Sequence, residues 1–396
     1  MVYEKVRFAQ IANQELVDLM RRAQKLTQGS YELYEKNYKA LSALFKKIIN
    51  ISRQEKEWYI YFNTLYNLMY ADMRTQNYRQ IVKYAEVYYR DSELYMDSAL
   101  PNYPGTDMAL LNVWICTRIF QAYVGYYQID DAKMEDFMRR YEETAQKYGH
   151  LYEYYQDEMY LSCLYRDSDR AQAAARSFLK HEKEITNCYV CAHTDYLEQL
   201  ILNGQYRQAE TLMLDLINKN IPQKHVWCYK YCEVAEPASM YSTVLQACVW
   251  NGKKDMFDYF YGKYWSTLPG ESQRHEDSNS FDRLLCAAGG NFEGYEDDLR
   301  VAAEDAKDEE NRDTTENNMQ AFLKWWRYFI LLDRSGVHTL PLTLPGLETD
   351  EDGQVRTLAV SDYMEARADY FGEQFAQVRA AFDYKFAKDA YKKCFL

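Results

Sequence analysis

The chain is poor in the residues that interrupt regular structure. Of its 396 residues only 15 are glycine and 7 are proline. A β-sandwich or barrel needs a turn about every 8–12 residues, and strand-like alternation is almost absent here. The sequence also lacks a Walker-type phosphate loop, a GxGxxG motif, an HExxH zinc motif and a GxSxG nucleophile elbow. These absences predict an all-α protein that is not an enzyme.

Long apolar segments are missing as well. The N-terminal residues 1–8 are charged where a signal peptide is apolar. The most apolar window, residues 109–129, is interrupted by Asn112, Arg118 and Gln121, which favours a buried helix over a membrane span. Nine cysteines without a signal peptide are typical of reduced thiols or metal ligands. We therefore expect a cytoplasmic protein without a membrane segment.

Positive charge is scarce relative to negative charge. The net charge is −13, and residues 293–316 alone carry 11 acidic and 3 basic residues, among them Glu296, Asp297 and Asp298. This acidity argues against nucleic-acid binding, which normally uses a basic surface. The acidic run is either a solvated helix face or a landing surface for a basic partner.

The chain repeats a helical pattern. Apolar residues recur at spacings of three and four through the proline-free stretches 1–100 and 105–221, which predicts successive helices. Breaks followed by an amphipathic segment are anchored at Tyr78, Ser168, Tyr206, Lys254 and Phe292, and a further unit is expected near residues 128–131. Units of about 34 to 47 residues are typical of tetratricopeptide-like α-solenoids, in which neighbouring helix pairs bury each other's apolar faces.

The last third of the chain does not follow this helical repeat pattern. We predict an α-solenoid over residues 1–320 and a C-terminal helical cap over residues 321–396. The cap begins with the apolar residues 321–332 and ends with a helix from about Ser361. Between them, the prolines of residues 337–347 favour an extended connector over a sheet.

Cysteine and histidine form the most reactive cluster in the sequence. Two groups stand 37 to 41 residues apart, Cys188 and Cys191 followed by His225, Cys228 and Cys232. Placed at the ends of adjacent repeat helices, they could complete a tetrahedral structural zinc site. Two alternatives stay open, namely buried thiols that pack as small hydrophobes and redox chemistry. A thioredoxin-like role is disfavoured because it requires a βαβ setting.

These residues also carry a resemblance to a family. The chain resembles uncharacterised bacterial tetratricopeptide-like proteins, from about residue 180 to 390. The shared residues are Cys188 and Cys191, the Cys-x4-Pro motif of residues 232–237, Gly290 and Asn291, the Leu-Pro pairs of residues 340–345, and Asp383. The resemblance implies the fold but no reaction, and it makes Cys232 a better ligand candidate than Cys228. The chain departs from the family at residues 384–386, where Tyr-Lys-Phe replaces the usual Arg-Asn-Gly.

Tyrosine is the most unusual abundance, with 39 residues. Clusters on the predicted helices include Tyr88-Tyr89, Tyr126-Tyr127 and Tyr154-Tyr155. A tyrosine can fill the groove between two helices and keep its hydroxyl at a wet edge. Adjacent tyrosines cannot face the same side of a helix, so some should reach a partner-binding surface.

We therefore predict a non-enzymatic scaffold that binds a protein or peptide through a tyrosine-rich groove and an acidic face. One alternative is an immunity or inhibitor protein that neutralises a basic toxin or nuclease. The other is a metal-dependent enzyme at the cysteine and histidine cluster.

Overall fold

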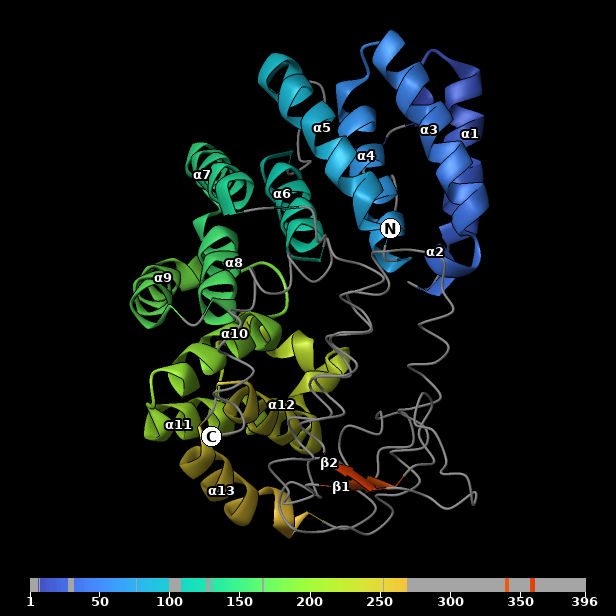
Figure 1. The fold of residues 1–396 in the computed structure, drawn as a ribbon. Helices are drawn as coiled ribbons and strands as arrows, with labels where there is room; N and C mark the ends of the chain where they lie inside the picture. Colours follow the sequence, from blue (N-terminus) through green and yellow to red (C-terminus); the bar gives the residue numbers. More distant parts are fainter. Residues whose placement is uncertain are drawn as a thin grey trace. The chain divides into compact units, whose positions relative to one another are not determined.

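The computed structural model describes residues 6, 8–27, 32–75, 77–99, 108–125, 129, 131–165, 167–251, 253–268, 339–341 and 357–359. Two compact units divide the chain, residues 1–154 and 155–396. Helices dominate the described residues of both units (Figure 1). The predicted boundary at residue 320, the residues of the expected cap helices and the acidic run 293–316 lie outside the described residues.

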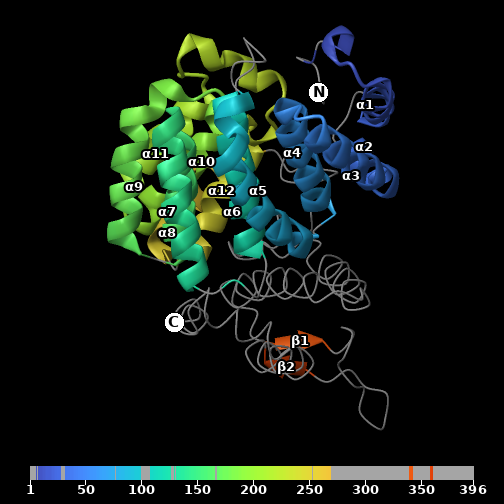
Figure 2. The same cartoon turned by 90° about the horizontal axis from the view of Figure 1, so that it is seen from above.

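The first unit is a series of helices joined by short connections. Its elements are η1 (Phe8–Gln10), α1 (Gln14–Thr27), α2 (Glu32–Lys36), α3 (Tyr38–Gln54), α4 (Trp58–Arg74), α5 (Tyr78–Ala99), α6 (Met108–Gly125), α7 (Asp131–Tyr148) and the start of α8 (Leu151–Leu164). Helix α4 contacts both α5 and α6, and α3 contacts both α1 and α4 (Figure 2). A helix that contacts the next helix and the next but one is typical of stacked helical repeats.

The second unit continues this pattern with short 3₁₀ segments. Its elements are the rest of α8, α9 (Ser168–His181), η3 (Glu182–Glu184), α10 (Tyr189–Leu202), α11 (Tyr206–Ile217), η4 (Gln223–Lys230), η5 (Glu233–Ala235), α12 (Pro237–Trp250), α13 (Lys254–Lys263) and η6 (Trp265–Thr267). Helix α10 contacts α9, α11 and α12, so it lies at the centre of this unit. The fold is therefore all-α and solenoid-like, as the periodicity predicts.

Four of the five predicted repeat anchors coincide with helix starts, and the fifth, Phe292, lies outside the described residues. Tyr78, Ser168, Tyr206 and Lys254 are the first residues of α5, α9, α11 and α13, and α7 begins at Asp131, where a further unit is expected. A side-chain cap marks the start of α9. The Asp167 side chain accepts a hydrogen bond of 3.0 Å from the Arg170 amide and so caps α9.

One connector differs from the prediction. Strand β1 (Thr339–Pro341) pairs antiparallel with β2 (Thr357–Ala359), and Leu340 lies opposite Leu358. The expectation of an extended connector without a sheet is therefore wrong at these residues. In this two-stranded sheet β1 is an edge strand, where the missing amide proton of Pro341 is tolerated.

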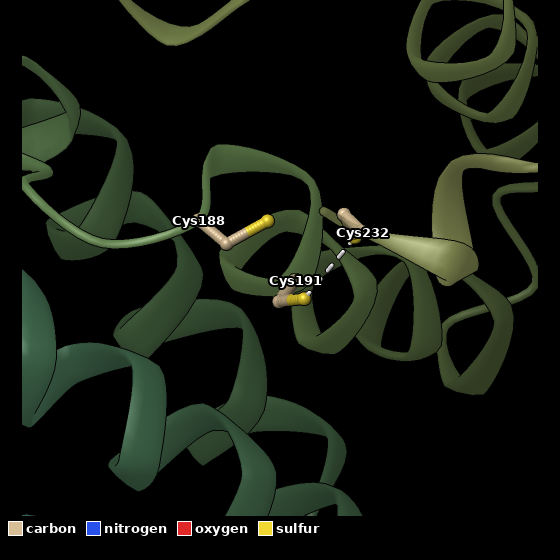
Figure 3. Close-up of side chains that lie close together, drawn as sticks. All are labelled: Cys188, Cys191 and Cys232. Carbon is tan, nitrogen blue, oxygen red and sulfur yellow. Dashed lines mark hydrogen bonds between the residues drawn. The ribbon is translucent and has the colours of Figure 1, made fainter. Parts of the chain in front are cut away.

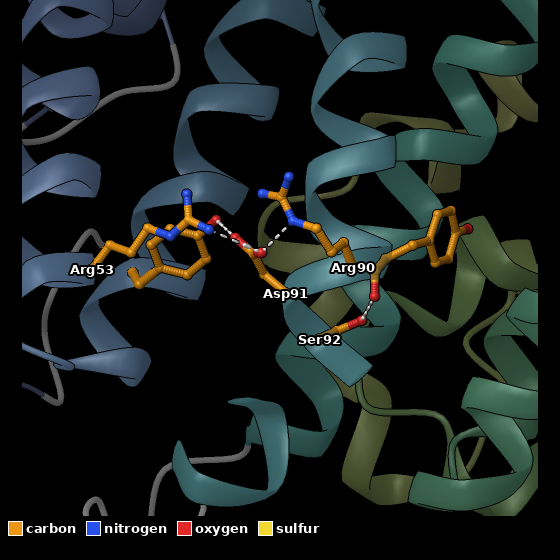
Figure 4. A network of polar contacts seen from close by, with 6 residues as sticks. Arg53, Arg90, Asp91 and Ser92 are labelled. Carbon is orange, nitrogen blue, oxygen red and sulfur yellow. Dashed lines mark hydrogen bonds and ion pairs between the residues drawn. The ribbon is translucent and has the colours of Figure 1, made fainter. Parts of the chain in front are cut away.

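Tyrosines supply polar contacts inside the first unit. Asp91 of α5 is completely buried and accepts hydrogen bonds from the Tyr61 hydroxyl at 2.5 Å and from Arg90 Nε at 2.8 Å. Arg53 of α3 approaches the same carboxylate at 3.4 Å (Figure 4). A buried carboxylate is tolerated only when it is paired and hydrogen-bonded, so this network ties α3, α4 and α5 together.

Among the described residues, no helix combines the length and the apolar character that a membrane crossing needs. The interrupted apolar window falls on α6, whose Leu111, Ile115 and Ile119 are buried in the core, in agreement with the predicted buried helix.

Candidate functional site

Three of the predicted cysteines meet in the second unit. Cys188 precedes α10, Cys191 lies in its first turn, and Cys232 follows η4 (Figure 3). Their sulfur atoms all lie within 4.8 Å of one another, and the Sγ atoms of Cys191 and Cys232 are 3.6 Å apart. Cys191 is exposed, whereas Cys188 and Cys232 are half-buried. Sequence-distant thiols thus form a cluster that is close enough to bind a metal ion.

Cys228 lies against the buried side of this cluster. Its Sγ accepts a hydrogen bond of 3.3 Å from the Tyr189 amide and also interacts with the Cys188 thiol. It is not one of the three mutually close sulfurs, but it belongs to the same group of interacting thiols. Burial raises the pKa of Cys228 to about 11. The three mutually close sulfurs include Cys232 and not Cys228, in line with the predicted preference for Cys232. Cys228 still interacts with the Cys188 thiol.

Negative charge in the cluster concentrates on one sulfur. Hydrogen bonding from Cys191, and then from Cys232 and Cys228, holds the pKa of Cys188 well below its usual range. The same arrangement raises the pKa of Cys191, first through its hydrogen bond to Cys188. A metal ion bound here would displace the remaining thiol protons into solvent, because the ligand form of cysteine is the thiolate.

His225 does not join the cluster. The ring of His225 is buried and packs against Tyr189, with ring centroids 4.9 Å apart. No group of mutually close metal-ligand atoms in the described residues includes it. The three-sulfur group therefore does not include His225, whose ligand role stays a prediction.

Tyr189 connects the cluster to a second layer of contacts. Its hydroxyl donates to the Glu182 carboxylate, and its ring stacks on His193 at 3.9 Å between centroids. His193 Nε2 lies 3.2 Å from the same carboxylate, and its hydrogen bond keeps the pKa of Glu182 low. These contacts fix Tyr189, whose amide in turn holds Cys228, in the manner of residues that orient metal ligands.

Sequence reasoning missed two exposed aromatic residues beside the cluster. Trp227 is 48% exposed and Tyr231 is 71% exposed, and both belong to the segment 223–231, which overlaps the second cysteine group. Lys230 Nζ lies 5.1 Å from the centre of the Tyr231 ring. The sequence did contain a signal for their exposure. Both residues stand next to the cysteines in a short polar segment, and such a segment cannot bury two large rings.

Two of the proposed partner-binding tyrosines lie in the core. Tyr88 is 1% exposed, and its hydroxyl donates to the Asn112 carbonyl at 3.3 Å, while Tyr154 packs edge-on against Tyr141. Assigning Tyr88 and Tyr154 to a partner surface is therefore wrong in this structure. Both fill grooves between helices, but the Tyr88 hydroxyl is buried rather than at the predicted wet edge.

The remaining partner residues stay predictions. Tyr89 lines a pocket of about 510 Å³ between α5, α6 and α7, and the Arg140 guanidinium lies 5.2 Å from its ring centre. Tyr155 is half-buried and stacks on His181. The other members lie outside the described residues, namely Tyr126, Tyr127, Glu296, Asp297 and Asp298.

No protein-family model, no curated protein and no solved structure matches the chain. The resemblance to tetratricopeptide-like proteins therefore stays a prediction, and the function must be argued from the geometry.

Proposed function

We propose that the protein is a helical-repeat scaffold whose second unit is held together by a structural zinc ion. The main observation in support of a zinc site is that the sulfur atoms of Cys188, Cys191 and Cys232 lie close together. Zn–S bonds of about 2.3 Å place ligand sulfurs about 3.8 Å apart at tetrahedral angles. The distance of 3.6 Å between the sulfurs of Cys191 and Cys232 is close to this value.

Cys228 completes the donor set. Four thiolates from a CxxC and a Cys-x3-Cys segment match the preference of zinc for sulfur in closed structural sites. The Tyr189 amide already donates to the Cys228 sulfur, which stabilises a thiolate there. Four protein ligands leave no open position for a substrate, so this arrangement supports a structural role and a protein that is not an enzyme.

The energetic role of the metal follows from the segments that it joins. Residues 218–236 run between α11 and α12 as turns and 3₁₀ segments, which have few backbone hydrogen bonds of their own. Zinc would fix Cys228 and Cys232 of this connection to the N-terminus of α10. Because unfolded chains lack the assembled site, metal binding contributes directly to folding stability.

Metal analysis of protein purified under reducing conditions tests this proposal. We expect about one zinc ion per chain, and loss of that ion together with a lower Tm in the variant Cys232→Ser. The matched control Cys163→Ala removes a buried thiol of the hydrophobic core and should keep the metal. Less than a few tenths of an equivalent of zinc in the wild type would refute the site.

We further propose that the connection fixed by the metal presents Trp227 and Tyr231 to a protein partner. Binding energy at interfaces concentrates on a few residues, among which tryptophan and tyrosine are enriched. A metal-fixed segment loses little conformational freedom on binding, which favours affinity. The immunity-protein alternative depends on the acidic run 293–316, and it stays a prediction.

Co-purification from the organism of origin tests the partner proposal. Tagged wild-type protein should recover one stoichiometric partner, and the double variant Trp227→Ala/Tyr231→Ala should lose it. The control Leu94→Ala truncates an exposed apolar side chain of the first unit and should retain the partner. A partner that the double variant retains in full would exclude this surface.

A further inference from the structure

Two sulfurs of the cluster lie close together where one of them is open to solvent. The Sγ atoms of Cys191 and Cys232 are 3.6 Å apart, and Cys191 is the exposed cysteine of the group (Figure 3). A disulfide needs about 2.05 Å between sulfurs, so small side-chain rotations of both cysteines would close the gap. No other cysteine described in the structure is classed as exposed.

We propose that Cys191 and Cys232 form a peroxide-sensitive pair, in which oxidation replaces the metal bridge between α10 and the η4–η5 connection by a disulfide. The release of metal rests on the zinc site proposed above. Formation of the crosslink does not, because it needs only the two neighbouring sulfurs and an oxidant.

The reaction balances with a hydroperoxide as the oxidant. The Cys191 thiol passes its proton to the neighbouring Cys188 thiolate and attacks one peroxide oxygen, the O–O bond breaks, and a sulfenic acid forms with release of hydroxide. The Cys232 thiolate then attacks the Cys191 sulfur and displaces a second hydroxide. Two thiolates lose two electrons in total, and hydrogen peroxide becomes two water molecules after protonation by solvent.

Accessibility selects this pair over the other thiols. Cys228 is buried and Cys188 is half-buried, so a peroxide in solution reaches Cys191 first. The resolving thiol must lie next to the sulfenic acid, and Cys232 satisfies this condition. Cys116, Cys163 and Cys248 are buried and lie outside the group of close sulfurs.

Oxidation replaces one crosslink between the two segments by another. Before oxidation four sulfurs would hold zinc, and afterwards the disulfide joins the same two segments while Cys188 and Cys228 are left as two thiols. Two protein thiols bind zinc far more weakly than four, so the metal should leave. The segment that carries Trp227 and Tyr231 stays attached to α10 but loses its links to Cys188.

Peptide mapping of the intact protein under non-reducing conditions tests the pair. Zinc is measured first, and the protein is then treated with one equivalent of hydrogen peroxide in the metal-loaded and the chelator-treated forms. We expect a single linkage between the peptides of Cys191 and Cys232 in both forms. In the loaded form we expect release of about one equivalent of zinc to a chromogenic chelator.

Two variants make the test specific. Cys191→Ser should abolish the crosslink, whereas Cys163→Ser should form it as fully as the wild type. A main linkage between Cys188 and Cys191 would overturn the proposal, as would a sulfinic acid at Cys191 without any crosslink. Protein that contains no zinc as purified, before any chelator, and still forms the Cys191–Cys232 disulfide would refute the zinc site but support the pair.

Discussion

Asp72 of α4 predicts a pH-dependent stability that can be measured. The Asp72 side chain is almost fully buried, and its Oδ1 atom accepts hydrogen bonds from the Tyr38 hydroxyl at 2.5 Å and from Asn77 Nδ2 at 3.1 Å. Its Oδ2 atom has no hydrogen-bond partner among the described residues. Burial raises the pKa of Asp72 from 3.8 to about 6, and the two hydrogen bonds only partly offset this effect.

The sign of the effect follows from this pKa. Because the folded protein holds the Asp72 proton more tightly than the unfolded chain does, the protonated form stabilises the fold below the unfolded pKa. This stability is lost as the pH rises through about 6, where the buried carboxyl ionises. The difference between the two pKa values corresponds to about 3 kcal/mol, since one pKa unit corresponds to about 1.4 kcal/mol.

The variant Asp72→Asn isolates this contribution, because an amide of the same shape stays neutral. Urea unfolding of the full chain gives the free energy of unfolding at each pH. The stability of the variant minus that of the wild type should rise by about 3 kcal/mol between about pH 4 and about pH 8.

The exposed Asp97, which pairs with Lys147 at 3.0 Å, is the matched control, and Asp97→Asn should show no comparable rise. A difference for Asp72→Asn that is constant with pH would show that its carboxyl is not desolvated as the structure indicates. A difference that falls as the pH rises would reverse the sign and refute the reasoning.

Two further predictions concern the two units separately. Asp91→Asn removes the buried carboxylate that Arg53 and Arg90 contact, and because both arginines are about half exposed it should lower the free energy of unfolding by only about 1 to 2 kcal/mol. Asp136→Asn, in an exposed ion pair, should cost less than about 1 kcal/mol in the same urea titration. Gly204 follows α10 with φ of +69°, so Gly204→Ala should lower the Tm at a cost of about 1 to 2 kcal/mol. Gly262→Ala in α13 meets no neighbouring atom and should be neutral or stabilising by up to about 1 kcal/mol. Equal Tm values for both alanine variants would contradict the role of the backbone conformation.

The sequence predicted the helical architecture down to the first residue of several helices. Helix starts at Tyr78, Ser168, Tyr206 and Lys254 agree with the predicted anchors because they depend on local signals. A break in apolar periodicity and a new amphipathic segment act within a few residues of each other, and at α9 a capping residue is added to them. The pairing of Pro341 with Thr357 was missed, because strand pairing joins residues that are distant in the sequence.

The candidate site could be predicted only in part. Spacing alone was enough to bring the two cysteine groups together, because adjacent repeats place corresponding helix ends side by side. It could not separate Cys228 from His225, since both lie in one short segment and the direction of each side chain depends on the turn geometry of η4. The abundance of tyrosine likewise predicted helix packing, but not which member of a pair is buried.

The amino-acid pattern was therefore sufficient for the fold class, for the predicted repeat starts that fall on described residues, and for the thiols that lie close enough to bind a metal. Tertiary packing alone determined that Tyr88 is in the core, that Asp91 meets two arginines, and that Cys191 lies beside Cys232. The physical reason is the range of the interactions. Helix formation responds to neighbours three and four residues away, whereas burial, ion pairing and metal geometry depend on residues that only the folded chain brings into contact.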